Sequence, residues 1–131
     1  MKSDYQIIVV DDDPQFIFLH NWSLKKLGFN VHPEHFQNGE KLVEFFKQNE
    51  DSQAKFLILL DIYMPIMDGW EVLEFLESKG SFDTIKVILV TSSVDKGDKI
   101  KAENYTSIID FLEKPLAIDY LMGLKDKTIF S

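Results

Sequence analysis

Acidic, hydroxyl and lysine side chains follow four apolar runs of the sequence. Asp11 and Asp12 follow the run IIVV, Asp61 follows FLILL, Thr91 follows VILV, and Lys114 comes two residues after IIDFL. Three carboxylates held close together repel one another and need a cation, and with oxygen ligands alone on offer the predicted ion is Mg²⁺. An aspartate carboxylate is also a nucleophile for phosphoryl groups. Mg²⁺, the lysine ammonium and the threonine hydroxyl can each bind one oxygen of a phosphoryl group on Asp61.

These side chains can act together only if the runs before them are neighbouring parallel strands. The runs IIVV, FLILL and VILV are apolar throughout, which is typical of strands buried on both faces. Strands are expected at Ile7–Val10, Phe56–Leu60, Ile85–Val90 and Ile108–Leu112. A weaker strand is expected at Asn30–Phe36, at an edge of the sheet, because Pro33 cannot donate to a ladder.

Helical patterns separate the strands. Asp13 is a preferred N-cap and Pro14 suits the first helical position, so a helix is expected from there to about Leu27. Further helices are expected at Glu40–Gln48, from Gly69 to about Lys79, from after Ser93 to about Asn104, and at Ile118–Lys127. Such alternation predicts an α/β domain with a parallel sheet and right-handed crossovers. The carboxyl ends of parallel strands share one edge, so the polar residues are expected to converge there.

The composition of the chain excludes several classes of protein. The chain has 131 residues, 45% of them hydrophobic, and shows no repeat or linker, which predicts one domain over residues 1–131. It has no cysteine, which excludes disulfides and thiolate metal sites. The net charge is −8 and every basic residue is lysine, which argues against direct binding of nucleic acid. No apolar run is long enough for a membrane span and the first residues are no secretory signal, so the cytoplasm is the expected location.

Four segments together resemble the receiver domain of two-component response regulators. They are IIVVDD, LLDIYMPIMDG, ILVTSS and FLEKP, and the resemblance covers nearly the whole chain. It implies a flavodoxin-like (βα)5 fold, a three-layer sandwich around a five-stranded parallel sheet of order 2-1-3-4-5. The expected type is a single-domain receiver similar to the chemotaxis receiver. No output domain is expected after Ser131, so the signal is expected to be read by another protein.

The resemblance also implies roles for the acidic residues. Asp11 and Asp12 would be the acidic pair that binds Mg²⁺, and Asp61 would be the phosphoacceptor and a third ligand. Receiver domains use the backbone carbonyl two residues after the phosphoacceptor as a further metal ligand, and this is Tyr63 here. The side chain of Tyr63 is large for a position that flanks the path of the hydrolytic water. We therefore expect slow autodephosphorylation.

The same resemblance implies a switch. Thr91 would be the switch hydroxyl and Lys114 the phosphate-contacting lysine, with a cis peptide before Pro115. The switch aromatic would be Phe111, where tyrosine is commoner. Phosphorylation would draw Thr91 toward the phosphoryl group and turn Phe111 inward. The face made by the fourth helix, the last strand and the last helix would then change for a partner.

A histidine kinase or a histidine phosphotransfer protein would donate the phosphoryl group. The protein would then be no enzyme in the usual sense, but a switch that catalyses its own aspartyl phosphorylation and slow dephosphorylation. The helix from Pro14 carries more apolar residues than one inward stripe requires. Receiver domains generally dock the donor beside this helix, so the surplus indicates either a partner surface or an overpacked core.

Two other functions remain open. A phosphatase of the haloacid dehalogenase class also uses a strand-terminal aspartate, and Asp11 and Asp13 match its spacing. However, Gln15 stands where threonine or valine is expected, and no cap insertion is evident. A degenerate receiver could instead act as a constitutive binding module, against which the intact set of site residues argues. The histidines His20, His32 and His35 are not expected to converge, so no metal or phosphohistidine site is predicted from them.

Overall fold

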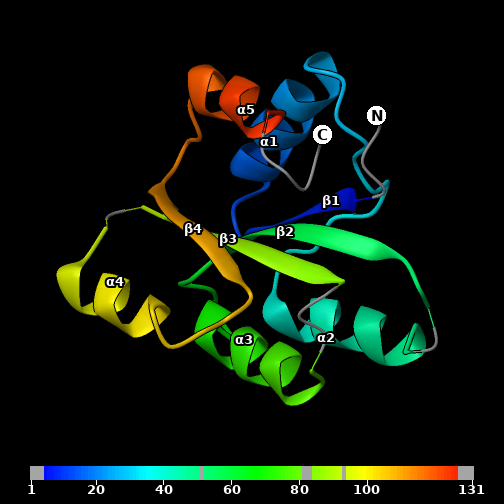
Figure 1. Cartoon of the computed structure of the whole chain (residues 1–131), viewed down its shortest axis with the longest axis vertical. Helices are drawn as coiled ribbons and strands as arrows, with labels where there is room; N and C mark the ends of the chain where they lie inside the picture. The colour runs from blue at the N-terminus through cyan, green and yellow to red at the C-terminus, as the bar shows by residue number, and fades with distance from the viewer. Residues whose placement is uncertain (1–4, 51, 81–83, 93, 127–131) are drawn as a thin grey trace.

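The computed structural model describes residues 5–50, 52–80, 84–92 and 94–126. Their elements follow in the order β1 (Tyr5–Val10), α1 (Pro14–Lys26), α2 (Gly39–Gln48), β2 (Lys55–Asp61), α3 (Gly69–Ser78), β3 (Ile85–Thr91), α4 (Lys96–Ala102), β4 (Ile108–Glu113) and α5 (Ile118–Leu124). The four strands of this described part pair in parallel, in the order β1-β2-β3-β4. Helices α1 and α5 cover one face of the sheet, and α2, α3 and α4 cover the other (Figure 1). The expected flavodoxin-like α/β architecture is confirmed.

The expected five-stranded sheet of order 2-1-3-4-5 is wrong in one respect. Residues 30–36 lie along β1, at the predicted edge, but within the described residues they form no strand. Two isolated bridges, at Val31 and Phe36, join them to β1. Between the bridges the Glu34 N–H donates to His32 Nδ1 at 3.2 Å and not to β1, and the carbonyl of Val9 accepts from Phe36 instead, so the ladder is interrupted there. The order of the remaining strands agrees with the prediction.

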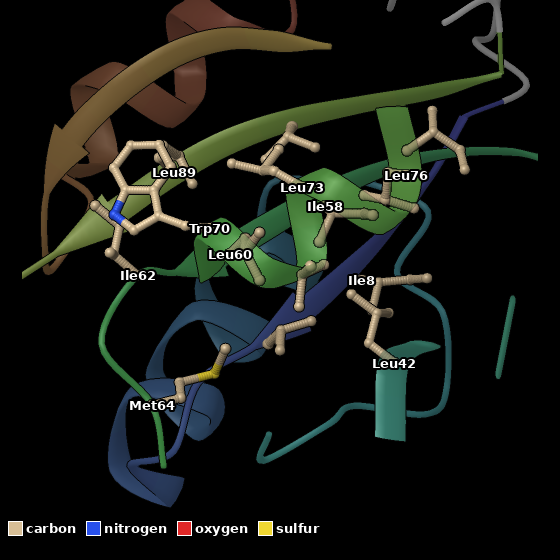
Figure 2. Close-up of a cluster of buried hydrophobic side chains, with 14 of the residues drawn as sticks. Ile8, Leu42, Ile58, Leu60, Ile62, Met64, Trp70, Leu73, Leu76 and Leu89 are labelled. Atoms are coloured by element: carbon tan, nitrogen blue, oxygen red, sulfur yellow. The ribbon is translucent and has the colours of Figure 1, made fainter. Parts of the chain in front are cut away.

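Side chains of the central strands point alternately into two hydrophobic clusters. Ile58 and Leu60 of β2 pack on one face with Leu73 of α3, as Figure 2 shows. Leu57 and Leu59 belong to the cluster on the other face, which α1 and α5 cover. Full burial of each aliphatic side chain contributes about 1.5–3 kcal/mol. The apolar runs are continuous because both faces of these strands are buried.

Helices α1 and α3 begin close to the carboxyl ends of β1 and β2. The Asp13 side chain accepts a hydrogen bond from the Gln15 N–H at 2.9 Å, so the predicted N-cap of α1 is confirmed. Gly69 begins α3, and its N–H donates to the carbonyl of Ile62 at 2.7 Å. A Cβ at Gly69 would lie only 2.8 Å from the carbonyl oxygen of Asp61. Glycine therefore lets α3 begin directly against the end of β2.

The predicted last helix ends earlier than expected. Helix α5 ends at Leu124, and Lys127, its predicted end, lies outside the described residues. Over the ranges that the structure describes, none of the helices has the length and apolar character of a membrane span.

Candidate functional site

Three carboxylates meet at the carboxyl ends of β1 and β2. The two strands pair in parallel with Val10 opposite Leu60, so the aspartates that follow are neighbours. Carboxylate oxygens of Asp11, Asp12 and Asp61 all lie within 4.8 Å of one another. Asp11 and Asp61 are buried, with 1% and 2% of their surfaces exposed, whereas Asp12 is exposed. The structure thus brings together the three carboxylates singled out from the sequence.

Lys114 completes this cluster from the end of β4. Its Nζ lies 2.9 Å from Asp11 Oδ2 and 3.3 Å from Asp61 Oδ2. Its backbone N–H donates to the carbonyl of Thr91 at 2.8 Å, and the peptide bond to Pro115 is cis, as expected. The ammonium is buried with the two carboxylates and partly neutralises them.

The electrostatics of the cluster follow from its burial. Burial, together with the charge of Asp11, raises the pKa of Asp61 from 3.8 to about 7, although Lys114 opposes this change. Burial also acts against the charged form of Lys114. The hydrogen bond to Asp11 and the charges of both carboxylates outweigh it, so the pKa of Lys114 is raised. Two buried carboxylates facing one ammonium leave a negative site that favours a further cation.

The ligand types in the cluster fit Mg²⁺. All three side chains offer carboxylate oxygens, the ligands that this ion prefers. Asp12 is open to solvent, which leaves room for the several waters that Mg²⁺ retains. The backbone carbonyl of Tyr63 remains a predicted further ligand.

The predicted switch residues lie on the two strands beside the cluster. Thr91 is the last residue of β3 and is buried, and Asp61 pairs with the residue just before it, Val90. Phe111 lies in β4 opposite Leu89 and is half-buried against the hydrophobic cluster on the face of the sheet that α3 covers. Thr91 therefore lies at the carboxyl edge of the sheet, and Phe111 lies on the neighbouring strand, two residues before its end.

Tyr63 and Asp98 form a contact that the sequence did not indicate. The Tyr63 side chain is exposed and its O–H donates to Asp98 Oδ2, in the first turn of α4. This hydrogen bond, with burial and nearby acidic charge, raises the pKa of Tyr63 to about 12. The loop that follows Asp61 is thereby tied to α4.

Two further residues of α1 reach the loop that carries Lys114. The Phe16 ring centroid lies 4.4 Å from the Lys114 Nζ. The His20 Nε2 accepts the backbone N–H of Leu116 at 3.1 Å. The sequence analysis did not connect either residue with Lys114. Their i,i+4 spacing, which puts both on one face of the helix, was the available signal.

Comparisons with known proteins agree on one family. The family model described as response regulator receiver domain matches residues 7–124. The chain is 30% identical over 129 residues to the two-component response regulator 24 of Arabidopsis thaliana, covering 98% of this chain and 87% of that protein. It is 28% identical over 127 residues to the sensor histidine kinase CheAY of Helicobacter pylori, covering 97% of this chain but 15% of that protein.

Solved structures show the same fold. A two-component response regulator from Cytophaga hutchinsonii superposes with a TM-score of 0.81 at 23% identity, covering 96% of both chains. A CheX–CheY–BeF3–Mg complex from Borrelia burgdorferi superposes with a TM-score of 0.76 at 22% identity, covering 93% of this chain and 87% of that one. With the family model matching most of its length, the chain belongs to the response regulator receiver domain family of two-component signal transduction.

Proposed function

We propose that this protein is a signalling switch in which Asp61 accepts a phosphoryl group, with Mg²⁺ as cofactor, from a histidine kinase or a histidine phosphotransfer protein. The observation that carries the proposal is the buried cluster of Asp11, Asp61 and Lys114, with Asp12 at its solvent side. A capping role explains a single strand-terminal aspartate, but it does not explain this cluster. The proposal includes the cytoplasmic location, the single domain and the absence of any other enzymatic activity.

Each residue of the cluster has a part in the proposed transfer. A carboxylate oxygen of Asp61 forms the new bond to phosphorus as the bond to the donor's imidazole nitrogen breaks, and that nitrogen takes the electron pair. The ammonium of Lys114 moves from Asp61 to a phosphoryl oxygen, and the hydroxyl of Thr91 donates to another. Asp11 and Asp12 would hold Mg²⁺, which would supply positive charge next to the oxygens of the transferred phosphoryl group.

Phosphorylation would then change the surface that faces the partner. Movement of Thr91 toward the phosphoryl group would leave room for Phe111 to turn inward. Both residues belong to adjacent strands, so the change would spread to α4, β4 and α5. Apolar side chains already lie exposed on these elements, among them Ile100, Ile109 and Met122. We include these exposed side chains in the proposal as part of the surface that a downstream protein partner contacts.

Helix α1 offers the place for the donor. Phe18 and Trp22 are 70% and 49% exposed, so the apolar surplus of this helix faces solvent in part. An overpacked core would have buried both side chains. We therefore include the outer face of α1 in the proposal as the surface on which the phosphodonor docks.

Intact mass after incubation with acetyl phosphate and Mg²⁺ tests the proposed function. We expect one phosphoryl group on the wild-type protein and none when EDTA removes the metal ion. The Asp61→Asn variant should take up none, because its amide is no nucleophile. A wild-type protein without the adduct, or a variant that still carries it, would refute the proposal.

Replacement of Tyr63 tests the lifetime of the phosphoryl group. The Tyr63→Asn variant is expected to lose it faster, on the order of tenfold, because a hydrolytic water can then be positioned beside Asp61. Decay is followed by intact mass after the donor has been removed. Asp98→Asn serves as the matched control, since it weakens the hydrogen bond to α4 but keeps the tyrosine ring. Equal decay of Tyr63→Asn and the wild-type protein would show that the side chain does not set the lifetime.

A further inference from the structure

A buried histidine joins α1 to the loop between β4 and α5. His20 is only 1% exposed, and its Nε2 accepts the N–H of Leu116 at 3.1 Å. Leu116 is the second residue after Lys114, so the bond holds the backbone of the loop that carries the lysine. A backbone N–H buried without a partner is costly, and the residue that supplies its acceptor therefore fixes the position of the loop.

Phe16 acts on the other end of the same lysine. It lies one turn before His20 on α1, and the two rings have centroids 6.0 Å apart. The Lys114 Nζ lies 4.4 Å from the centroid of the Phe16 ring, well within the roughly 6 Å over which an ammonium is attracted to an aromatic face. The same Nζ contacts Asp11 and Asp61, so the ring helps to hold it beside the carboxylates.

The protonation state of His20 suits this role. Burial, and then the charge of Lys114, lower the pKa of His20 to about 4. The imidazole is neutral at neutral pH, and since Nε2 accepts, the ring proton belongs on Nδ1. A neutral acceptor can be buried near an ammonium without adding a second positive charge to the site.

We propose that Phe16 and His20 position Lys114 for phosphoryl transfer: His20 fixes the backbone of its loop, and Phe16 holds its ammonium. This inference rests on the proposed function of Asp61. Both are positioning residues, since neither is placed to contact the phosphoryl group. A lysine ammonium on its flexible four-carbon stem can occupy many positions, and support at both ends removes most of them.

Rates of phosphorylation by acetyl phosphate at saturating Mg²⁺ test the inference. His20→Leu fills the same space but offers no acceptor to Leu116. We expect its rate constant at saturating donor to fall roughly tenfold, as for other lost partners that orient a functional group. The Mg²⁺ concentration for half-maximal rate should not change, because the carboxylates are untouched. His20→Gln, whose amide oxygen can take the place of Nε2, should restore the rate to within about twofold of wild type.

A control variant separates positioning from stability. Leu24 is fully buried on α1, one turn after His20. Leu24→Ala should lower the stability of the fold as core truncations do, yet leave the rate of phosphorylation unchanged. Phe16→Leu, at a half-buried position that tolerates the change, should lower the rate about threefold without affecting Mg²⁺.

The possible outcomes distinguish the inference from the proposed function. If His20→Leu is phosphorylated as fast as wild type, or slows no more than Leu24→Ala, the positioning role is refuted and the proposed function stands. If the wild-type protein itself takes up no phosphoryl group, the proposed function fails and the inference with it. If His20→Leu does not fold, measurements on Phe16→Leu and on the wild-type protein test the positioning role instead. Nuclear magnetic resonance must then show a nitrogen–nitrogen scalar coupling between His20 Nε2 and the Leu116 amide, and its absence, or an unchanged rate for Phe16→Leu, overturns the inference.

Discussion

The Asp61→Asn variant is expected to be more stable than the wild-type protein, with a free energy of unfolding about 2 kcal/mol higher at pH 8 without Mg²⁺. Burial raises the pKa of Asp61 from 3.8 to about 7, so between these values the folded protein binds the proton that the unfolded chain has released. The stability of the wild-type protein therefore falls as the pH rises from about 4 to 7. Asparagine carries no charge and avoids this loss. The shift corresponds to about 4 kcal/mol and already includes the attraction to Lys114. The buried amide of asparagine has to find hydrogen-bond partners of its own, which lowers the expected gain to about 2 kcal/mol.

Urea unfolding at pH 5 and pH 8 checks this expectation. The difference between Asp61→Asn and wild type should be larger at pH 8, where the wild-type carboxylate is ionised. Mg²⁺ should reduce the difference, because it binds the folded wild-type protein and stabilises it. Asp126→Asn, at an exposed position of the C-terminal part of the chain, is the control and should show almost no difference. A less stable Asp61→Asn variant, or a difference independent of pH, would contradict the electrostatic argument.

Loss of the lysine should have the opposite effect on stability. Lys114→Met is expected to lower the free energy of unfolding by about 3–5 kcal/mol at pH 8 without Mg²⁺, the usual cost of removing one partner from a buried ion pair. The ammonium lies 2.9 Å from Asp11 Oδ2 and 3.3 Å from Asp61 Oδ2, and without it two buried carboxylates face each other. Urea unfolding measures the loss.

An exposed ion pair of the same length is the matched control. Lys79 Nζ also lies 2.9 Å from a carboxylate oxygen, that of Glu50, but both side chains are exposed. Lys79→Met should cost less than about 1 kcal/mol. Adding Asp61→Asn to Lys114→Met should recover part of the loss, because one of the two stranded carboxylates is then neutral. A Lys114→Met variant no less stable than Lys79→Met would disprove the claim that burial makes this cluster strong.

The sequence was sufficient to predict most of the sheet because its central strands are buried on both faces. Their continuous apolar runs mark the strands, and parallel pairing then brings Asp11, Asp61 and Lys114 to one edge. The fifth strand could not be judged in this way. Whether residues 30–36 form a ladder depends on each backbone hydrogen bond, and the Glu34 N–H bonds the His32 side chain instead of β1.

Contacts between a helix and a loop far away in the sequence could not be predicted from the sequence. His20 and Leu116 are separated by 96 positions, and Tyr63 and Asp98 by 35. No periodicity connects such pairs, since each contact is set by the packing of a helix against a loop. A buried histidine at a helical position is usually a core residue that happens to be polar, and only its hydrogen bond to the loop reveals a role.

The interrupted edge beside β1 also bears on how this protein avoids sticking to itself. The free edge of a sheet presents unpaired N–H and C=O groups on which a second chain can build. Residues 30–36 occupy that edge, bonding β1 at Val31 and Phe36. Their own outer side carries Pro33, which has no N–H to offer an incoming strand. The segment therefore disfavours the addition of a strand from a second molecule at this edge. Association of two molecules at this edge would have to rely on side-chain contacts and not on backbone hydrogen bonds between strands.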